Sequence, residues 1–162
     1  INDYNWYMPN LGIVLFNPEI PPNTGNVIRL CANTGSELHI IKPIAFQMDE
    51  KSLRRAGLDY FKTIKTVFYE NIDEFLEFDK YKRYFLVSKY GTKRYDQFKY
   101  YKGDCFIFGS ETKGLSHDVF KKFKKSPKIF IPMNSKSRSL NLANSVAICV
   151  YEALRQNKFQ FL

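Results

Sequence analysis

The chain has 162 residues, which suits one domain with a real hydrophobic core. It lacks any apolar run near the roughly 18 to 20 residues that a membrane span needs, and its polar opening does not fit a signal peptide, so we expect a cytoplasmic protein. Its three cysteines, Cys31, Cys105 and Cys149, lie far apart within apolar segments. This pattern predicts buried thiols and neither disulfides nor a metal site.

The net charge of +9 is unevenly distributed along the chain. Residues 1–79 hold 7 Lys and Arg against 11 Asp and Glu, whereas residues 80–162 hold 18 against 5. The two halves therefore carry −4 and +13, and five lysines crowd into KKFKKSPK at 121–128. A basic half attracts a phosphate backbone, so nucleic acid is the expected partner, although a lysine-rich run also decorates ordinary solvated faces.

Strands and helices are predicted to alternate along the chain. Short apolar runs predict strands, and apolar residues spaced three or four apart predict helices. In chain order we expect a strand at 11–16, a helix from residue 23 or 24 to 33, strands at 38–42 and 63–69 separated by a short helix at 52–57, a helix at 72–78, strands at 84–88 and 104–108, a helix at 117–125, a strand at 129–131 and a helix from about 140 to 158. About six strands with helices between most of them predict a single-domain α/β fold, with a mostly parallel sheet and helices on both faces.

Prolines and glycines suggest where the elements end. NPEIPP at 17–22 predicts a rigid loop that is neither helical nor paired, after which Asn23 or Thr24 caps the first helix. Gly35 follows that helix and predicts a left-handed C-terminal residue. Residues 1–10 lack periodicity, so we expect a disordered or cloning-derived extension ahead of a domain at 11–162.

Three polar loops, at 17–29, 108–115 and 131–145, each follow a predicted strand. The carboxyl ends of strands are where open α/β sheets bind ligands, so a ligand site is expected there. A solvated connection with a serine cap would also account for part of the third loop. The chain lacks a P-loop and a dinucleotide fingerprint, and His39 and His117 fit structural positions better than catalytic ones.

Four segments carry a resemblance to a known family: NPEIPPNTGNVIRLCANTG, LRRAGLDY, FGSETKGL and IPMNSKSRSLNLANSVAICVYEALRQ. Their order and spacing resemble the SPOUT superfamily of knotted RNA methyltransferases, in particular its small tRNA (cytidine/uridine-2′-O)-methyltransferases. The resemblance implies a C-terminal deep trefoil knot, S-adenosyl-L-methionine as cofactor, and 2′-O-methylation of the wobble C or U of tRNA. The alternatives are methylation at another tRNA or ribosomal RNA site, and a catalytically silent RNA-binding protein.

The resemblance also implies roles for individual residues. The catalytic set is Arg29, Asn23, Glu111, Ser139 and Asn141; the cofactor set is Val87, Gly109, Ile131, Ser139 and Leu140; and the RNA-binding set is Arg29, Arg54, Arg55, Lys113 and Arg138. Since a guanidinium stays protonated in proteins, we expect Arg29 to clamp a phosphate and stabilise the developing alkoxide instead of acting as a base. Ser110 and Lys113 depart from the family's usual proline and arginine, which affects RNA positioning more than cofactor binding.

The last helix predicts an assembly. Val146, Cys149, Val150, Ala153 and Leu154 form one apolar stripe, while Ile148, Tyr151, Phe159, Phe161 and Leu162 fall outside it. Apolar surface of this extent usually marks an interface. The resemblance agrees, because the family forms homodimers through this helix and the first-motif helix, so we expect a twofold dimer in which Arg29 serves the partner's cofactor.

Overall fold

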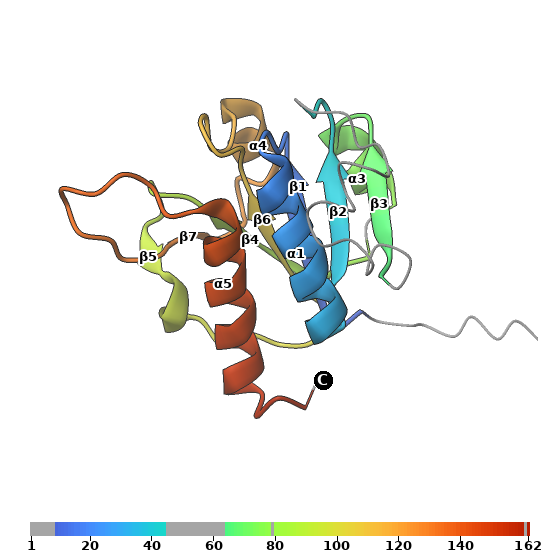
Figure 1. The fold of residues 1–162 in the computed structure, drawn as a ribbon, viewed down its shortest axis with the longest axis vertical. Helices are drawn as coiled ribbons and strands as arrows, with labels where there is room; N and C mark the ends of the chain where they lie inside the picture. The colour runs from blue at the N-terminus through green and yellow to red at the C-terminus, as the bar shows by residue number, and fades with distance from the viewer. Residues whose placement is uncertain (1–8, 45–63, 79, 161) are drawn as a thin grey trace, which may run out of the picture.

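The fold is a seven-stranded sheet flanked by helices (Figure 1). The computed structural model describes residues 9–44, 64–78, 80–160 and 162. Its elements in chain order are β1 (Leu11–Phe16), α1 (Pro21–Thr34), β2 (Glu37–Ile41), β3 (Thr66–Tyr69), α3 (Ile72–Glu77), β4 (Arg83–Val87), β5 (Lys93–Arg94), the 3₁₀ helix η2 (Tyr95–Gln97), β6 (Asp104–Phe108), α4 (His117–Lys122), β7 (Lys128–Phe130) and α5 (Leu142–Gln156). Every pairing between these strands is parallel, which confirms the predicted α/β class.

The sheet order is β3-β2-β1-β6-β4-β7-β5, so β7 lies between β4 and β5, two strands that follow one another in the chain. The turn that joins β4 to β5 therefore has to pass over β7. At the crossing, a Cβ added to Gly91 would lie 2.3 Å from the carbonyl carbon of Ile129, so only glycine fits there. A knot requires the chain to pass through a loop formed earlier, and the position of β7 beneath the turn between β4 and β5 meets this requirement. The trefoil knot itself stays a prediction.

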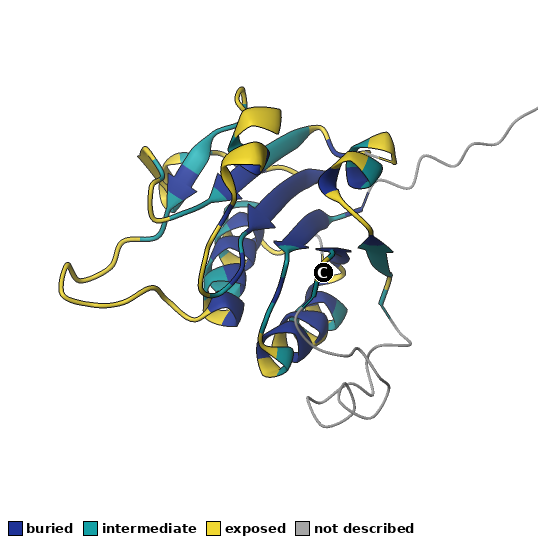
Figure 2. Cartoon of the chain, turned by 90° about the horizontal axis from the view of Figure 1, so that it is seen from above, coloured by how far each residue is buried: buried dark blue, intermediate teal, exposed yellow. Residues whose placement is uncertain are grey.

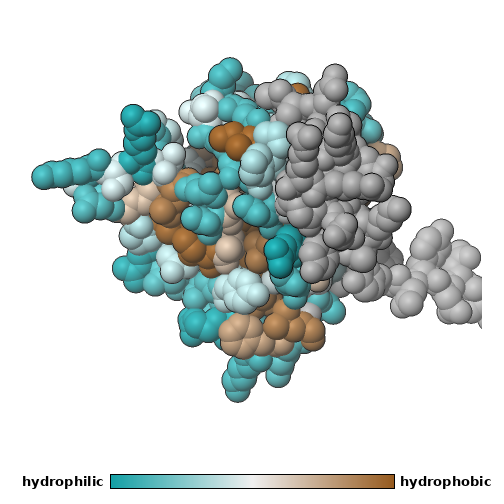
Figure 3. Space-filling model, viewed as in Figure 1, coloured by the Kyte–Doolittle hydropathy of each residue, from teal (hydrophilic) through white to brown (hydrophobic). Residues whose placement is uncertain are grey.

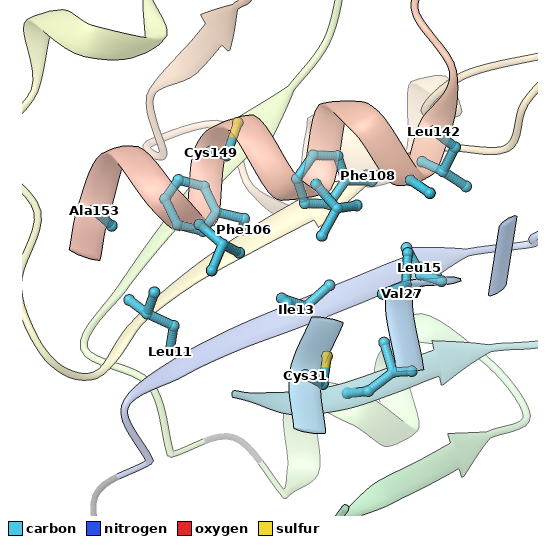
Figure 4. Packing of buried hydrophobic residues seen from close by; sticks show 14 of the residues in the cluster. Leu11, Ile13, Leu15, Val27, Cys31, Phe106, Phe108, Leu142, Cys149 and Ala153 are labelled. Atoms are coloured by element: carbon cyan, nitrogen blue, oxygen red, sulfur yellow. The ribbon is translucent and has the colours of Figure 1, made fainter. Parts of the chain in front are cut away.

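The core has two layers, one on each face of the sheet. On one face, α1 and α5 lie side by side and cover the apolar side chains of the central strands. Figure 4 shows Phe106 and Phe108 of β6 packed beneath α5, with Ile13 of β1 near Cys31 of α1. On the other face, the alternate residues of the same strands pack with α3 and α4. The prediction of helices on both faces is confirmed.

The start of α1 differs from the prediction. The helix begins at Pro21, with Ile20 at the N-cap, so the expectation that 17–22 contains no helical residue is wrong. The reason is that the first helical positions need no N–H donor and favour the fixed φ of proline. Neither Asn23 nor Thr24 caps the helix, and both are buried within its first turn. Gly35 does take the predicted left-handed conformation, with φ of 63°.

The remaining elements agree closely with the prediction, with three exceptions. Strand β3 begins at Thr66, so the described residues 64 and 65, which were predicted to belong to it, precede the strand. The short β5 and η2 were missed because two exposed charged residues, Lys93 and Arg94, carry no periodicity. Helix α4 ends at Lys122, three residues earlier than expected. The predicted apolar stripe of α5 is buried, and all three cysteines are buried and free, as expected.

Some predictions fall on residues that the structure does not describe. The short helix at 52–57, with Arg54 and Arg55, lies outside the described residues, as does Phe161. Of the N-terminal ten residues only Pro9 and Asn10 are described: Pro9 is buried, and the carbonyl of Asn10 accepts a hydrogen bond from Gly103 N at 2.9 Å. No helix among the described residues is long and apolar enough to cross a membrane.

Candidate functional site

A cavity of about 520 Å³ opens at the carboxyl end of the sheet, within the range of small-molecule sites. Val87 and Phe108, the last residues of β4 and β6, line it, as does Ile131, which directly follows β7. Its walls come from the three polar loops, which the sequence placed after separate strands and which the fold brings together. The third loop, between β7 and α5, projects from the side of the molecule, and its residues 132–140 are all exposed (Figures 1 and 2).

Glu111 connects the second loop to the first. Its carboxylate accepts hydrogen bonds from Glu19 N at 2.8 Å and Ile20 N at 3.0 Å, and from Asn23 Nδ2 at 3.2 Å. These backbone donors lie at the start of α1, whose N-cap residue Ile20 supplies no side-chain acceptor. A carboxylate at this position also interacts favourably with the positive end of the helix dipole. Glu111 thus holds the segment that leads into α1 from a loop some ninety residues away in the chain.

Asn141 connects the third loop to the first. Its Nδ2 donates to Asn23 Oδ1 at 2.8 Å, while its Oδ1 accepts from Asn144 N at 3.2 Å and so caps α5. Asn23 therefore lies between Glu111 and Asn141, donating to one and accepting from the other. Its side chain is buried, which explains why it needs both partners. One chain of hydrogen bonds thereby fixes the three loops relative to one another.

The second loop folds tightly back on itself. Ser110 and Gly114 exchange two backbone hydrogen bonds, at 2.9 and 3.2 Å. A Cβ added to Gly109 would lie 2.0 Å from the carbonyl carbon of Gly114 and 2.2 Å from the nitrogen of Leu115. The absence of a side chain at Gly109 therefore lets the loop close on itself.

The fold brings most of the expected site residues to the cavity. All five expected cofactor residues line it, and so do four of the five expected catalytic residues and one expected RNA-binding residue: Val87, Gly109, Ile131, Ser139, Leu140, Asn23, Glu111, Asn141 and Lys113. Arg29 is an exposed residue of α1 that does not line the cavity, and Arg138 is exposed on the third loop, also away from the lining. The roles of these residues stay predictions.

Sequence reasoning missed one part of the wall. Ser88, Lys89 and Tyr90, in the turn after β4, also line the cavity. The strand was predicted to end at Ser88, and the polar turn that follows it meets the same condition as the other three loops. Its position after a strand of the sheet was the signal that could have identified it.

The lysines of 121–128 form a basic surface beside α4. Lys121, Lys122, Lys124 and Lys125 are exposed. Lys122 pairs with Asp73 of α3, and the ammonium of Lys128 lies 5.0 Å from the ring centre of Phe120. Most of this positive charge therefore faces solvent, as an interface with a phosphate backbone requires.

A second cluster of polar side chains lies away from the cavity, on the α3 face of β2. His39 Nδ1 and Nε2 lie 3.0 and 2.6 Å from the hydroxyls of Tyr69 and Tyr81, and Tyr81 donates to Glu37 at 3.2 Å. Burial lowers the pKa of His39 to about 4 and raises the pKa of Tyr69 to about 12, so both are neutral near pH 7. None of these groups lines the cavity, in agreement with the structural role expected for His39.

Comparison with known proteins gives a consistent answer. Residues 10–151 match the SpoU rRNA Methylase family. A tRNA (cytidine(34)-2′-O)-methyltransferase from Escherichia coli strain K12 is 49% identical over 146 residues, covering 90% of this chain and 93% of that protein, and one from Methylovorus glucosotrophus is 44% identical over 147 residues, covering 91% and 96%.

A solved structure described as giving insight into the 2-OH methylation of C/U34 on tRNA superimposes with a TM-score of 0.84 at 37% identity, covering 93% of this chain and 97% of that one. The fold is also that of the SpoU methyltransferase AviRb from Streptomyces viridochromogenes, with a TM-score of 0.83 at 22% identity, covering 98% of this chain and 63% of that one. Sequence and fold together place the chain in the SpoU methylase family.

Proposed function

We propose that the protein methylates the ribose 2′-hydroxyl of the wobble nucleotide, a C or U, in the anticodon loop of tRNA. The main support is that all five expected cofactor residues and four of the five expected catalytic residues line one cavity. The chain is also 49% identical to a tRNA (cytidine(34)-2′-O)-methyltransferase over almost its full length. The family description mentions rRNA, so methylation of ribosomal RNA is the second candidate. The identity of the relatives favours tRNA.

The cavity suits S-adenosyl-L-methionine by the chemistry of its lining. The apolar side chains of Val87, Ile131 and Leu140 line the cavity, and an adenine ring could pack its faces against them. Leu140 is 38% exposed and lines the cavity, so a ligand bound there would bury more of its side chain. When bound, the cofactor supplies an electrophilic methyl group on a sulfonium.

We propose that Glu111 and Asn23 act by positioning. The oxygens of Glu111 already accept bonds from Glu19 N, Ile20 N and Asn23, so its carboxylate is committed to holding the first loop against the second. Asn23 in turn fixes Asn141 and thereby the third loop. Holding reactants within the geometry of attack is itself a large part of catalysis, because small misplacements of reacting atoms slow the reaction strongly.

We also propose a homodimer in which Arg29 of one subunit completes the cavity of the other. Arg29 is exposed on α1 and lies outside the cavity of its own chain, so a second subunit could receive it. Tyr151, Phe159 and Leu162 expose apolar surface on and after α5, beside α1, and Figure 3 shows hydrophobic surface over α5 and near the C-terminal end. In a shared site the guanidinium would bind the RNA phosphate and stabilise the developing 2′-alkoxide. Such an enzyme would work in the cytoplasm, with its tRNA substrate.

The proposed reaction is tested with bulk tRNA from cells that lack the gene. The purified protein and S-adenosylmethionine are expected to add one 2′-O-methyl group at position 34 of particular tRNAs, mapped by nuclease digestion and mass spectrometry. A Leu140→Trp variant, which fills the cavity from an exposed position, serves as the inactive control. Methylation of ribosomal RNA alone, or of other tRNA positions alone, would contradict the proposal.

The shared site is tested by mixing Arg29→Ala and Leu140→Trp proteins under conditions that allow subunits to exchange. Heterodimers contain one cavity with an intact lining and an intact Arg29 from the partner, so part of the activity should return. Sites contained in one chain would give no recovery. A monomeric mass by light scattering at micromolar concentration would reject the dimer.

A further inference from the structure

Tyr90 is an exposed aromatic residue at the edge of the cavity. It is 72% exposed, more than any other large hydrophobic residue in the described part of the chain, and it is one of the lining residues. An aromatic ring this exposed buries little apolar surface within its own chain. Its position beside a cavity makes it a surface for a partner that stacks.

The turn that carries Tyr90 is held firmly. Tyr90 N donates to Ser88 Oγ at 3.2 Å, and Gly91 N donates to Ser88 O at 2.9 Å. On either side of the turn, Ser88 N donates to Ile129 O at 3.0 Å and Thr92 N to Lys128 O at 2.9 Å. Because Gly91 also lies against the backbone of β7, the turn is fixed at both ends. Tyr90 is therefore presented by a pre-organised support, which lowers the entropy cost of stacking on it.

Two lysines line the same cavity as Tyr90. Lys89 and Lys113 both line the cavity and are exposed, and the ammonium of Lys89 lies 5.1 Å from the ring centre of Tyr90. Neither lysine forms an ion pair with any residue in 9–44, 64–78, 80–160 or 162. An aromatic face beside unpaired ammonium groups matches a nucleotide, which offers a flat base and a phosphate a short distance apart.

We propose that Tyr90 stacks on the base of the target nucleotide while Lys89 and Lys113 hold the adjoining phosphates. The inference rests on the proposed function and adds the residues that place the nucleotide. Stacking accepts any base, because every base has a π-face, and so suits an enzyme whose relatives act on C/U34. Val87 and Ile131 are half-buried, whereas Tyr90 is exposed, so the ring is placed to meet the RNA instead of the cofactor.

The first test compares Tyr90→Ala with Tyr90→Phe, using bulk tRNA from cells lacking the gene. Loss of a base stack should lower kcat/KM for tRNA by about tenfold or more in Tyr90→Ala, and Tyr90→Phe should restore it because the π-face returns. Affinity for S-adenosylmethionine, measured by calorimetry, should stay unchanged in both. The control is Tyr101→Ala, which removes an exposed tyrosine that also lies near cationic side chains but away from the cavity.

Three outcomes of this test overturn the inference. Equal kcat/KM in Tyr90→Ala and wild type would show that Tyr90 does not stack on the target base. A parallel loss of S-adenosylmethionine affinity assigns the ring to the cofactor, and a failure of Tyr90→Phe to restore activity assigns the effect to the hydroxyl. If the wild-type protein methylates no tRNA, the proposed function is wrong. Failure of the proposed function is thereby distinguished from failure of the proposal for Tyr90, which requires an active wild-type enzyme.

A second measurement tests the contact directly. A full-length tRNA carrying 5-iodouridine at position 34, irradiated in complex with the wild-type protein, should crosslink to the peptide that contains Tyr90. Crosslinking should disappear in Tyr90→Ala and persist in Tyr101→Ala. A crosslink to a different peptide would show that another residue meets the target base, and would overturn the proposal.

Discussion

Two clusters of polar side chains, the cavity loops and the group around His39, use hydrogen bonds for different purposes. In the cavity, Glu111 and Asn141 each bond to Asn23 and so join the first loop to two loops that follow it 88 and 118 residues later in the sequence, and all three residues line the cavity. Around His39, the tyrosine hydroxyls bond within a buried layer, with the ring of Phe75 5.3 Å from that of His39. The first arrangement shapes a site, whereas the second satisfies polar groups within the core.

The difference shows that a perturbed pKa is not by itself a sign of function. Among the described residues, buried groups away from the cavity have clearly shifted pKa values, because burial lowers the pKa of His39 and raises the pKa of Tyr81. Desolvation disfavours the charged form wherever the group is placed. Access to a cavity is what separates a site from a satisfied core cluster, and substitutions in the two regions should therefore fail in different ways.

The largest effect is expected from Gly109→Val in the cavity. The new side chain would overlap the backbone of Gly114 and Leu115, so the second loop cannot close. We expect S-adenosylmethionine affinity and methyl transfer to fall by about a hundredfold, together with a loss of about 1–3 kcal/mol in the free energy of unfolding. Calorimetry and urea unfolding measure the two effects.

Gly114→Ala is the matched control for that prediction. A Cβ at Gly114 meets no atom within 4 Å, although its φ of 67° strains any other residue. The strain costs about 1–2 kcal/mol of stability, but the loop can still close, so cofactor binding should survive. Loss of cofactor binding in Gly114→Ala, or its retention in Gly109→Val, would contradict the account of the loop.

The second prediction concerns His39 and the dependence of stability on pH. Because the folded pKa of about 4 is below the ordinary 6.5, the unfolded chain binds a proton that the folded chain excludes between these values. The neutral ring makes its full contribution to the free energy of unfolding above pH 6.5. As the pH falls from 6.5 towards 4, the free energy of unfolding should decrease by about 3 kcal/mol. Urea unfolding across this range measures the loss.

His39→Gln gives the comparison, because glutamine keeps hydrogen-bonding groups for Tyr69 and Tyr81 but does not titrate. The variant should lose less stability than wild type between pH 6.5 and 4, whatever its stability at neutral pH. Equal slopes in the two proteins would show that another group carries the pH dependence. Methyl transfer at neutral pH should change little beyond any loss of folded protein, since the cluster does not border the cavity.

The sequence predicted the site better than it predicted the local details that build it. Strand ends, polar loops and the α5 stripe follow from periodicity, and the resemblance selected the residues that border the cavity. The sequence could not reveal that Glu111 binds the backbone of Glu19 and Ile20 ahead of α1, because the two segments meet only through the tertiary fold. Similarly, the steric role of Gly109 depends on Gly114, and the crossing at Gly91 depends on the insertion of β7.

The smallest effect is expected from the bond between Asn23 and Asn141. Asn141→Ala removes both the cap on α5 and the link to Asn23, whereas Asn141→Ser keeps a good capping residue with a side chain too short for the link. The free energy of unfolding of Asn141→Ser should therefore exceed that of Asn141→Ala by the capping contribution of about 1 kcal/mol. Methyl transfer should be impaired in both variants. Their mass by light scattering should equal that of wild type.

A double-mutant cycle isolates the link itself. Asn23→Ala and Asn141→Ser are combined, and the coupling in the free energy of unfolding should be about 0.5–1.5 kcal/mol, the net worth of one hydrogen bond. Coupling near zero together with normal turnover would mean that the three loops hold their positions without this bond. The chain of bonds through Asn23 would then resemble the His39 cluster, satisfying buried groups without shaping the cavity. Coupling together with lost turnover would show that the same hydrogen bond contributes to both the fold and the reaction.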